Sequence, residues 1–252
     1  MDVQAYLNRI NYHGSLEPTA ETLRQLHLAH LLAVPFENLS IHAPEPIVLE
    51  DDALFEKIVS RRRGGFCYEL NGLFAGLLRA LGFKVEMLSA QVADDEGGFS
   101  RDFDHMTLIV SGEQRWLADV GFGDSFVEPL LLDAREAQMQ RDRAYRIVAD
   151  GEWLILERAD NGRDWKPQYS FTLQPFQYPD YAEMCEYHQT SPESHFVRSR
   201  ICSRLTPEGR ISLTEKLLIT TEGNQRHEQP VATPEEYVEM LRQHFRIVMR
   251  QP

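Results

Sequence analysis

The stretch RRRGGFCYELNGLF, residues 61–74, is the most informative segment of this chain. Three arginines run into a pair of glycines, and Cys67 stands directly before a segment of helical periodicity. Gly82 follows that segment, where a helix often ends on a left-handed residue. The apolar positions that carry the period are Leu70, Phe74, Leu77, Leu78 and Leu81. We therefore expect a helix that begins at Cys67.

The surroundings of Cys67 are typical of a nucleophile. A helix N-terminus and nearby cations both favour the thiolate, and such settings lower the pKa of a cysteine from about 8.5 toward ~3.5–7.5. Gly64 and Gly65 permit unusual backbone angles and would leave the approach to the sulfur open. The structural alternative is a small buried apolar residue, the usual state of a lone cysteine. Cys185 and Cys202 lack comparable surroundings, and we expect both to be structural.

Length and composition restrict the class of protein. The 252 residues suit one large domain or two to three smaller ones with a shared core. The net charge of −13 argues against nucleic acid as a partner, since binding to it requires a basic surface. Three cysteines without a CxxC pair indicate a reducing compartment. With no signal-peptide pattern and no run of about 18 apolar residues, we expect a cytoplasmic protein without a membrane partner.

The pattern of the chain changes near residue 83. Before it, helical periodicity covers residues 2–10, 19–34, 49–61 and 67–82. After it, short segments rich in β-formers and separated by turn residues predict an antiparallel sheet or barrel. Residues 179–192 read as a crossing helix, and Pro207–Gly209 as a turn between two strands. Thr233 and Pro234 mark the start of a C-terminal helix. Together these elements predict an α+β protein.

His105 is the candidate base for Cys67, because it opens one predicted strand while Asp119 closes the next. If residues 111–113 form a three-residue hairpin loop, the two side chains face each other with Cβ atoms roughly 4.5–5.5 Å apart. A two-residue loop would place them on opposite faces of the sheet. The alternative for His105 is a strand-end histidine satisfied by water. The VGFG turn at 120–123 would carry Phe122 into open space.

A metal site is not expected. His27 and His30 lie three residues apart on a predicted helix and could bind a metal. No carboxylate or cysteine stands at a matching spacing, so the ligand set would be incomplete.

Four pieces of the sequence, in order and spacing, resemble the arylamine N-acetyltransferases, including the bacterial N-hydroxyarylamine O-acetyltransferases. They are VPFENL at 34–39, RRGGFCYELNGLF at 62–74, His105, and WLADVGFG at 116–123. The resemblance extends over nearly the whole chain and implies a papain-like cysteine-enzyme core. It implies a helical bundle at 1–82, a β-barrel at 83–178, an interdomain segment at 179–200 and an α/β lid at 201–252.

The resemblance also implies chemistry. Cys67, His105 and Asp119 would form a catalytic triad that moves an acetyl group from acetyl-CoA, through acetyl-cysteine, to arylamines, arylhydrazines or N-hydroxyarylamines, as in xenobiotic metabolism. Phe122 and Phe126 would lie near the acceptor. The arginine run at 61–63 is the obvious cationic patch for a small anionic ligand. The resemblance weakens that idea, because it implies that Arg63 is structural and pairs with Glu37.

Two residues depart from the family pattern, and there are three rival functions, of which the two enzymatic ones would use the same triad. Asp104 stands where many members have threonine, and Asp124 where some have a basic or small residue; both could alter the charge of the pocket. The rivals are a cysteine hydrolase or transglutaminase-like enzyme, a biosynthetic amide synthase that closes a macrocycle, and a non-catalytic ligand-binding protein.

Overall fold

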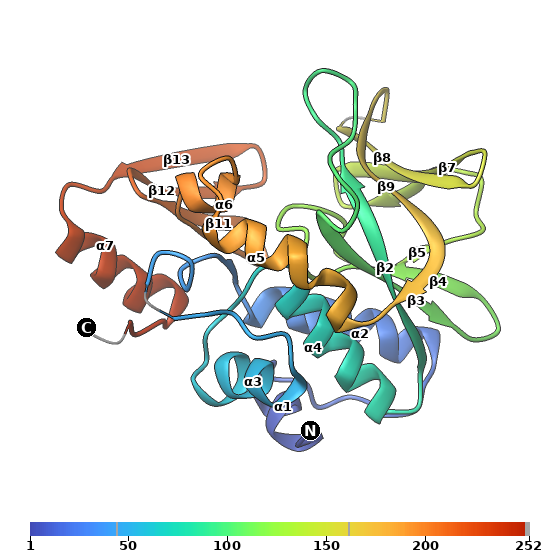
Figure 1. Cartoon of the computed structure of the whole chain (residues 1–252), viewed down its shortest axis with the longest axis horizontal. Helices are drawn as coiled ribbons and strands as arrows, with labels where there is room; N and C mark the ends of the chain where they lie inside the picture. The colour runs from blue at the N-terminus through green and yellow to red at the C-terminus, as the bar shows by residue number, and fades with distance from the viewer. Residues whose placement is uncertain (44, 161, 250–252) are drawn as a thin grey trace.

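The computed structural model describes residues 1–43, 45–160 and 162–249. Its first third is helical, as the periodicity predicted (Figure 1). Thr19 caps the second helix by accepting the N–H of Thr22, and Gly82 follows the fourth with φ at 90°. The elements are α1 (Val3–Arg9), α2 (Ala20–Ala33), α3 (Asp51–Phe55), the π-helix η1 (Glu56–Ser60) and α4 (Cys67–Ala80). The helix expected over 49–61 is therefore an α-helix that continues as a π-helix.

The middle of the chain is an antiparallel sheet that curves into a nearly closed barrel (Figure 1). The strand order is β5-β4-β3-β2-β9-β8-β7-β6, so β5 and β6 are the edge strands, while the long β2 and β9, the first and last strands of the segment, pair at the centre. The strands are β2 (Lys84–Val92), β3 (His105–Ser111), β4 (Arg115–Ala118), β5 (Leu130–Leu131), β6 (Gln138–Gln140), β7 (Arg143–Asp150), β8 (Trp153–Asp160) and β9 (Asp164–Phe176).

The β3–β4 hairpin differs from the predicted register by two positions. Ser111 pairs with Arg115, so the loop is 112–114 and not 111–113. Leu108 lies opposite Ala118, which leaves Asp119 two positions short of the place across from His105. A shift of two keeps every side chain on its expected face, because side chains alternate with a period of two. The predicted face was right and the direct opposition was wrong.

The last part of the chain forms a second sheet of five strands, β1-β10-β11-β12-β13. Its edge strand β1 (Phe36–Glu37) comes from the N-terminal part, where Phe36 pairs with Ser203 and Glu37 with Cys202. The other elements are η2 (Tyr178–Tyr181), α5 (Ala182–Thr190), α6 (His195–Arg198), β10 (Ile201–Leu205), β11 (Gly209–Thr214), β12 (Leu217–Glu222), β13 (Gln225–Pro230), α7 (Pro234–Met240) and the π-helix η3 (Leu241–Phe245). The last three residues of the predicted lid, 250–252, lie outside the described residues.

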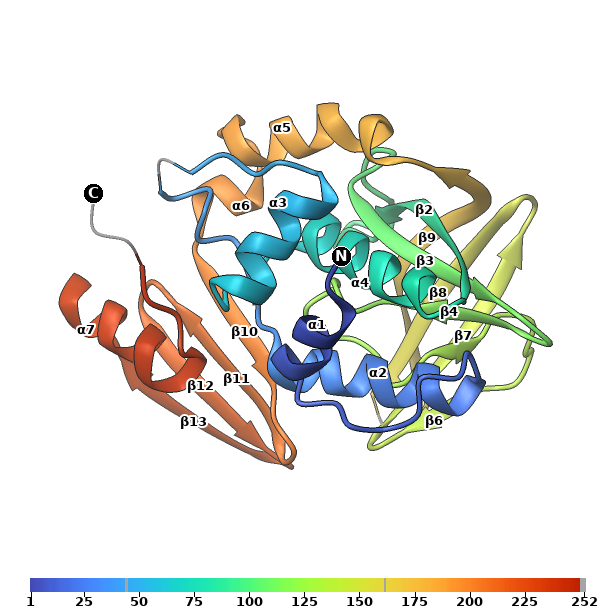
Figure 2. The same ribbon diagram turned by 90° about the horizontal axis from the view of Figure 1, so that it is seen from below.

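Helix α4 is the centre of the molecule. In Figure 2 it lies between the other N-terminal helices and the strands β2 and β3, and its side chains from Cys67 to Ala75 are all buried. The largest apolar cluster joins this helix to α1, α2, α3 and the near face of the barrel. Within the described ranges, no helix combines the length and apolar character needed to cross a bilayer. The position of Cys67 is thus fixed by the core itself.

Candidate active site

Cys67 is the first residue of α4 and is only 2% exposed. Its sulfur accepts hydrogen bonds from the backbone N–H groups of Tyr68 and Met106. Met106 follows His105 in β3, so the sulfur lies against the strand that His105 opens. The imidazole of His105 is not among the hydrogen-bond partners of the sulfur in the described part of the chain.

The electrostatic setting of Cys67 differs from the prediction. Burial raises the pKa of the Cys67 thiol well above its ordinary value, the carboxylates of Asp104 and Asp119 raise it further, and the two backbone N–H groups lower it. The arginine run does not act on the sulfur, since Arg61 and Arg63 are engaged by glutamates. The expectation of a lowered pKa was therefore wrong, and the thiol needs a base to accept its proton.

The glycine pair also has a different role from the one expected. Gly64 and Gly65 are buried and do not open a path to the sulfur. A Cβ on Gly64 would lie 1.9 Å from the carbonyl oxygen of Pro35, and one on Gly65 would lie 2.7 Å from Oε2 of Glu69. Gly64 permits close approach of the Pro35 backbone, and Gly65 makes room for the Glu69 side chain at the start of α4.

His105 and Asp119 are in direct contact. Nε2 of His105 lies 2.7 Å from Oδ2 of Asp119, with the side chains 3% and 0% exposed. Burial alone would raise the pKa of the Asp119 carboxyl, but His105, with hydrogen bonds from Asn71 and Gly121, lowers it below its ordinary value. Asp119 is therefore ionised at neutral pH, and it accepts a hydrogen bond from the ring. This leaves Nδ1 as the ring nitrogen that can take a proton.

Asn71 is a site residue that the sequence reasoning missed. Its Nδ2 donates to Oδ1 of Asp119 at 2.8 Å and to the carbonyl of Met106 at 2.6 Å, and its Oδ1 accepts the N–H of Val120 at 2.8 Å. Asn71 thus ties α4, β3 and the Asp119 segment together. The signal was present in the sequence, because Asn71 lies four residues after Cys67 and so on the same helical face.

Gly121 brings the Asp119 segment against Cys67. A Cβ on Gly121 would lie 2.8 Å from Cα of Cys67 and 2.7 Å from Nδ2 of Asn71. Only a residue without a side chain fits this contact. The backbone N–H of Gly121 in turn donates to Oδ1 of Asp119 at 2.9 Å. The three predicted residues thus meet in one buried region.

His27 contacts this segment with both of its ring nitrogens. Its Nε2 lies 3.1 Å from the backbone N of Asp119, and its Nδ1 lies 2.9 Å from the carbonyl of Val127. Burial lowers the pKa of His27 to about 4, so the ring is neutral, accepting from one and donating to the other. Among the described residues, no group of three or more metal-binding side chains is assembled.

The two predicted aromatic residues have different environments. Phe122 is half-buried, and its ring lies edge-on to His105 with centroids 5.1 Å apart. Tyr169, which the sequence did not single out, lies 5.2 Å from the His105 ring and 5.1 Å from the Phe122 ring. Phe126 is 1% exposed and stacks on His27 at 5.7 Å. Of the two predicted aromatic residues, Phe122 lies beside His105 and Phe126 does not.

Comparisons with known proteins agree with this geometry. The family model described as "N-acetyltransferase" matches residues 19–252. The arylamine N-acetyltransferase / N-hydroxyarylamine O-acetyltransferase of Salmonella typhimurium is 38% identical over 215 residues, which are 84% of this chain and 76% of that protein. This chain belongs to the arylamine N-acetyltransferase family.

Two further family relatives bear on function. The structure of Mycobacterium marinum arylamine N-acetyltransferase in complex with CoA superposes with a TM-score of 0.89 at 31% identity, covering 98% of this chain and 93% of that one. The proansamycin X synthase of Amycolatopsis mediterranei is 30% identical over 244 residues, which are 94% of each chain. This acyltransferase family therefore includes relatives with more than one named activity.

In this family member Arg63 and Glu37 form a buried ion pair. Nε and Nη2 of Arg63 lie 2.9 and 3.0 Å from the two carboxylate oxygens of Glu37. Burial would raise the pKa of Glu37, but Lys57 and Arg63 lower it below its ordinary value. The pair joins the loop before α4 to β1, and thus to the C-terminal sheet.

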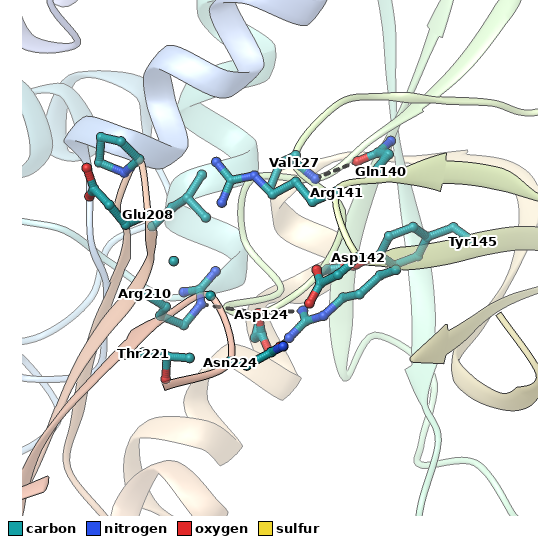
Figure 3. Close-up of a pocket in the computed structure, with 16 residues that line it drawn as sticks. Asp124, Val127, Gln140, Arg141, Asp142, Tyr145, Glu208, Arg210, Thr221 and Asn224 are labelled. Carbon is teal, nitrogen blue, oxygen red and sulfur yellow. Dashed lines mark hydrogen bonds and ion pairs between the residues drawn. The ribbon is translucent and has the colours of Figure 1, made fainter. Parts of the chain in front are cut away.

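A cavity of about 520 Å³ opens between the barrel and the C-terminal sheet of the acetyltransferase fold (Figure 3). Asp124, which follows the VGFG turn, accepts from Arg143 at 2.8 Å and from Arg210 at 3.2 Å. Figure 3 shows Arg141 extending across the cavity from the β6–β7 side toward the turn that carries Glu208. Arg158 also approaches Asp124, at 3.9 Å, so three guanidinium groups surround this one carboxylate.

Proposed function

We propose that this protein transfers the acetyl group of acetyl-CoA to an aromatic amine by a ping-pong mechanism with an acetyl-Cys67 intermediate. The observation that supports it most is the buried contact chain from the Cys67 sulfur through β3 to His105 and the ionised Asp119. Acetyl transfer is the activity named in the family, and the CoA complex of the Mycobacterium marinum protein supports the choice of donor.

In the first half-reaction, His105 takes the proton of Cys67 while the sulfur attacks the thioester carbonyl. Because burial holds Cys67 as a thiol, this transfer is needed for attack, and it requires the His105 ring to come within hydrogen-bond reach of the sulfur in the complex with the donor. Asp119 stabilises the imidazolium that forms. Backbone N–H groups at the start of α4 would stabilise the oxyanion, by about 2.7–4 kcal/mol for each donor. The CoA thiolate then leaves and takes the proton from His105.

In the second half-reaction, the amine nitrogen attacks the carbonyl of acetyl-Cys67. His105 accepts the proton that the nitrogen loses, a contribution of roughly 10²–10⁴ in rate. The Cys67 thiolate leaves and regains its proton from the imidazolium. Phe122, beside the His105 ring, would stack on the aromatic acceptor, which favours arylamines, arylhydrazines and N-hydroxyarylamines. Phe126 would act indirectly, through the position of His27.

The cavity between the barrel and the C-terminal sheet is the proposed place for the phosphorylated end of the donor. Arg141, Arg143 and Arg210 line it, and guanidinium groups suit phosphate recognition. Asp124 and Asp142 lie on the same lining, so the net charge available to a phosphate is smaller than the arginines alone would give.

Two rival functions would use the same three residues, Cys67, His105 and Asp119. A cysteine hydrolase or transglutaminase-like enzyme would pass the acyl group to water or to a protein amine. A biosynthetic amide synthase is favoured by one observation, the 94% mutual coverage with proansamycin X synthase. We place it second because arylamine N-acetyltransferases reach higher identity, 38% against 30%.

The test is steady-state turnover of p-nitrophenyl acetate and of acetyl-CoA, each with and without an arylamine. We expect turnover to rise with the amine, and double-reciprocal plots for acetyl-CoA at several amine concentrations to be parallel. Turnover by water alone that the amine leaves unchanged would overturn the proposal in favour of a hydrolase.

We also propose a cytoplasmic location and a role in the metabolism of foreign aromatic compounds. The three cysteines are free thiols in the structure, which suits a reducing compartment. Fractionation of the cells that make the protein would check the location.

A further inference from the structure

Strand β13 leaves one edge of the C-terminal sheet unpaired. It is the last strand in the order β1-β10-β11-β12-β13, so among the described residues β12 is the strand that pairs with it. In Figure 1 and Figure 2 its outer side faces away from the rest of the molecule. All of its residues, Gln225–Pro230, are exposed. An unpaired edge of this kind can pair with a strand of another molecule.

A hydrogen bond at the end of β13 shows which of its backbone groups face outward. The N–H of Val231, directly after the strand, donates to the carbonyl of Lys216 at 2.9 Å and continues the β12–β13 register. Because the direction of the backbone groups alternates along a strand, every second residue back from Val231 bonds to β12, namely Gln229, His227 and Gln225. The N–H and C=O groups of Arg226 and Glu228 therefore face the open edge.

The sequence QRHEQ, residues 225–229, is complementary to itself in charge. When a second, antiparallel copy is centred on His227, Arg226 lies opposite Glu228 of the second copy, and Glu228 lies opposite its Arg226. The glutamines at 225 and 229 lie opposite each other in the same way. Both charged pairs fall at positions whose backbone groups face outward, so each pair can exchange two backbone hydrogen bonds.

Other centres of symmetry are less favourable. A centre at Arg226 or at Glu228 places like charges directly opposite each other, which is destabilising. A centre at Gln225 or Gln229 brings a turn residue or Pro230 into the pairing, and proline has no N–H to donate. Charges on an edge strand usually prevent pairing, but these charges permit one register.

We propose that β13 is the interface of a symmetric dimer, in which two copies of this chain pair their β13 strands antiparallel about His227. The two C-terminal sheets would join into one continuous sheet. Residues 225–229 of each strand supply the pairing, so the dimer is weak and depends on protein concentration. The exposed pair of Arg226 and Glu228 within one strand, 2.6 Å between nitrogen and oxygen, would be exchanged for two pairs between copies. Dimer formation does not depend on acetyl transfer.

The first test is a disulfide at the centre of the interface. Residue 227 would face its own copy at a position without hydrogen bonds between the copies, where the two Cα atoms are about 4.5 Å apart. That separation suits a disulfide, so His227→Cys should give a covalent dimer with diamide, which takes up the two thiol hydrogens. Gln225→Cys, on the same face of β13 but far from its own copy in this register, is the matched control and should stay monomeric. The native cysteines are buried and do not compete.

The second test separates contacts between copies from the pair within one strand. Arg226→Glu alone and Glu228→Arg alone each place like charges opposite each other. We expect the dimer dissociation constant, measured by sedimentation velocity, to rise roughly tenfold in each. Arg242→Glu, which breaks an exposed pair after α7, should leave it unchanged.

An equal mixture of the two single variants is the decisive sample. In a heterodimer of these variants a carboxylate again lies opposite a guanidinium at both positions, so the mixture should associate about as tightly as the wild-type protein. Neither variant has the pair within its own strand, so a role confined to one strand would not be rescued by mixing.

A covalent dimer of His227→Cys but not of Gln225→Cys, together with rescue in the mixture, supports the proposal. A wild-type protein that stays monomeric as its concentration is raised would overturn it. So would equal cross-linking of the two cysteine variants, a dimer that Arg226→Glu leaves intact, or a mixture no tighter than either variant alone. If the dimer forms but the wild-type protein turns over no acyl donor, the proposed function fails while the dimer stands.

Discussion

The reactivity of Cys67 depends on which group accepts the proton of its thiol. The thiol is buried, and its pKa is raised by that burial and by two carboxylates, so proximity to a helix end does not by itself produce a thiolate. The ionised Asp119 lies 2.7 Å from Nε2 of His105 and orients the ring, which leaves Nδ1 as the nitrogen for the sulfur proton. Reactivity therefore depends on the position of His105 and Asp119, and on Asn71, which holds them.

Asn71→Ala tests this dependence. The change removes the Asn71 donor to Asp119 and leaves the N–H of Val120 without its acceptor. We expect a loss of about 1–3 kcal/mol in the free energy of unfolding. We also expect a fall of roughly 10² in the acetylation rate, because the carboxylate is no longer held in position. Stopped-flow acetylation by acetyl-CoA measures the rate. Asn8→Ala, at an exposed helical asparagine, is the matched control, and an equal effect there would contradict the account.

Sequence reasoning singled out Cys67, His105 and Asp119 because each stands next to an informative element boundary, and the structure brings the three into one buried region. It did not settle the burial of Phe126, since an aromatic after a glycine turn fits a pocket wall as well as a core. It assigned Gly64 and Gly65 to access because nothing in the local sequence reveals Pro35, which lies far away in the chain and against which Gly64 packs. Contacts between distant segments are the part that a single sequence does not display.

At the scale of elements, the VGFG turn packs directly against the start of α4. Gly121→Ala would push the turn away from Cys67, since its Cβ would lie 2.8 Å from Cα of Cys67. We expect a stability loss of about 1–3 kcal/mol and a larger loss of acetylation, because the His105–Asp119 contact shifts with the turn. Gly112→Ala, in the β3–β4 loop, meets its nearest atom at 3.9 Å and is the control. Thermal unfolding and acetylation rates together check it, and a fully active Gly121→Ala would contradict the account.

The ion pair between Glu37 of β1 and Arg63 of the loop before α4 makes the stability of the protein sensitive to acid. The pKa of Glu37 in the folded protein lies below its ordinary value of 4.5. Its contribution to stability is therefore complete above about pH 4.5 and is lost as the pH falls through the lower folded value. The pKa of Asp119 is also lowered in the folded protein, so its contribution to stability is likewise lost on acidification. We expect the free energy of unfolding, measured by urea denaturation, to decline on acidification in this window.

Glu37→Gln should remove part of that decline and destabilise the protein at neutral pH. Leaving Arg63 buried without its main partner costs roughly 3–5 kcal/mol, toward the lower end because Glu45 remains 3.3 Å away. Glu21→Gln breaks an exposed pair with Arg24 and serves as the control, for which little change is expected. An unaltered acid profile in Glu37→Gln would show that the pair does not carry the pH dependence.

The order and type of most elements followed from periodicity and caps, as Thr19 before α2 and Thr233 before α7 illustrate. The register of the β3–β4 hairpin could not be predicted in this way, because 111–113 and 112–114 are equally plausible three-residue loops. Strand β13 was missed since all of its residues are exposed and none alternates in polarity. Edge strands of this kind are defined by their partner and not by their own sequence.

Across the whole molecule, the barrel and the C-terminal sheet meet at Asp124 and its arginines, on the wall of the cavity in Figure 3. The proposal that this cavity takes the phosphorylated end of acetyl-CoA predicts a selective effect. Arg210→Gln should raise the KM for acetyl-CoA several-fold and leave p-nitrophenyl acetate, which has no phosphate, unaffected. Equal effects on both donors would argue for a structural role of Arg210 alone.

The most direct measurement is mass spectrometry of the protein after brief mixing with acetyl-CoA in the absence of any acceptor. The account predicts a single added acetyl group on the peptide that contains Cys67. It predicts none in Cys67→Ala, much slower addition in His105→Gln, and loss of the group when an arylamine is added. An acetyl group on another residue, or addition to His105→Gln at the rate of the unaltered protein, would contradict it.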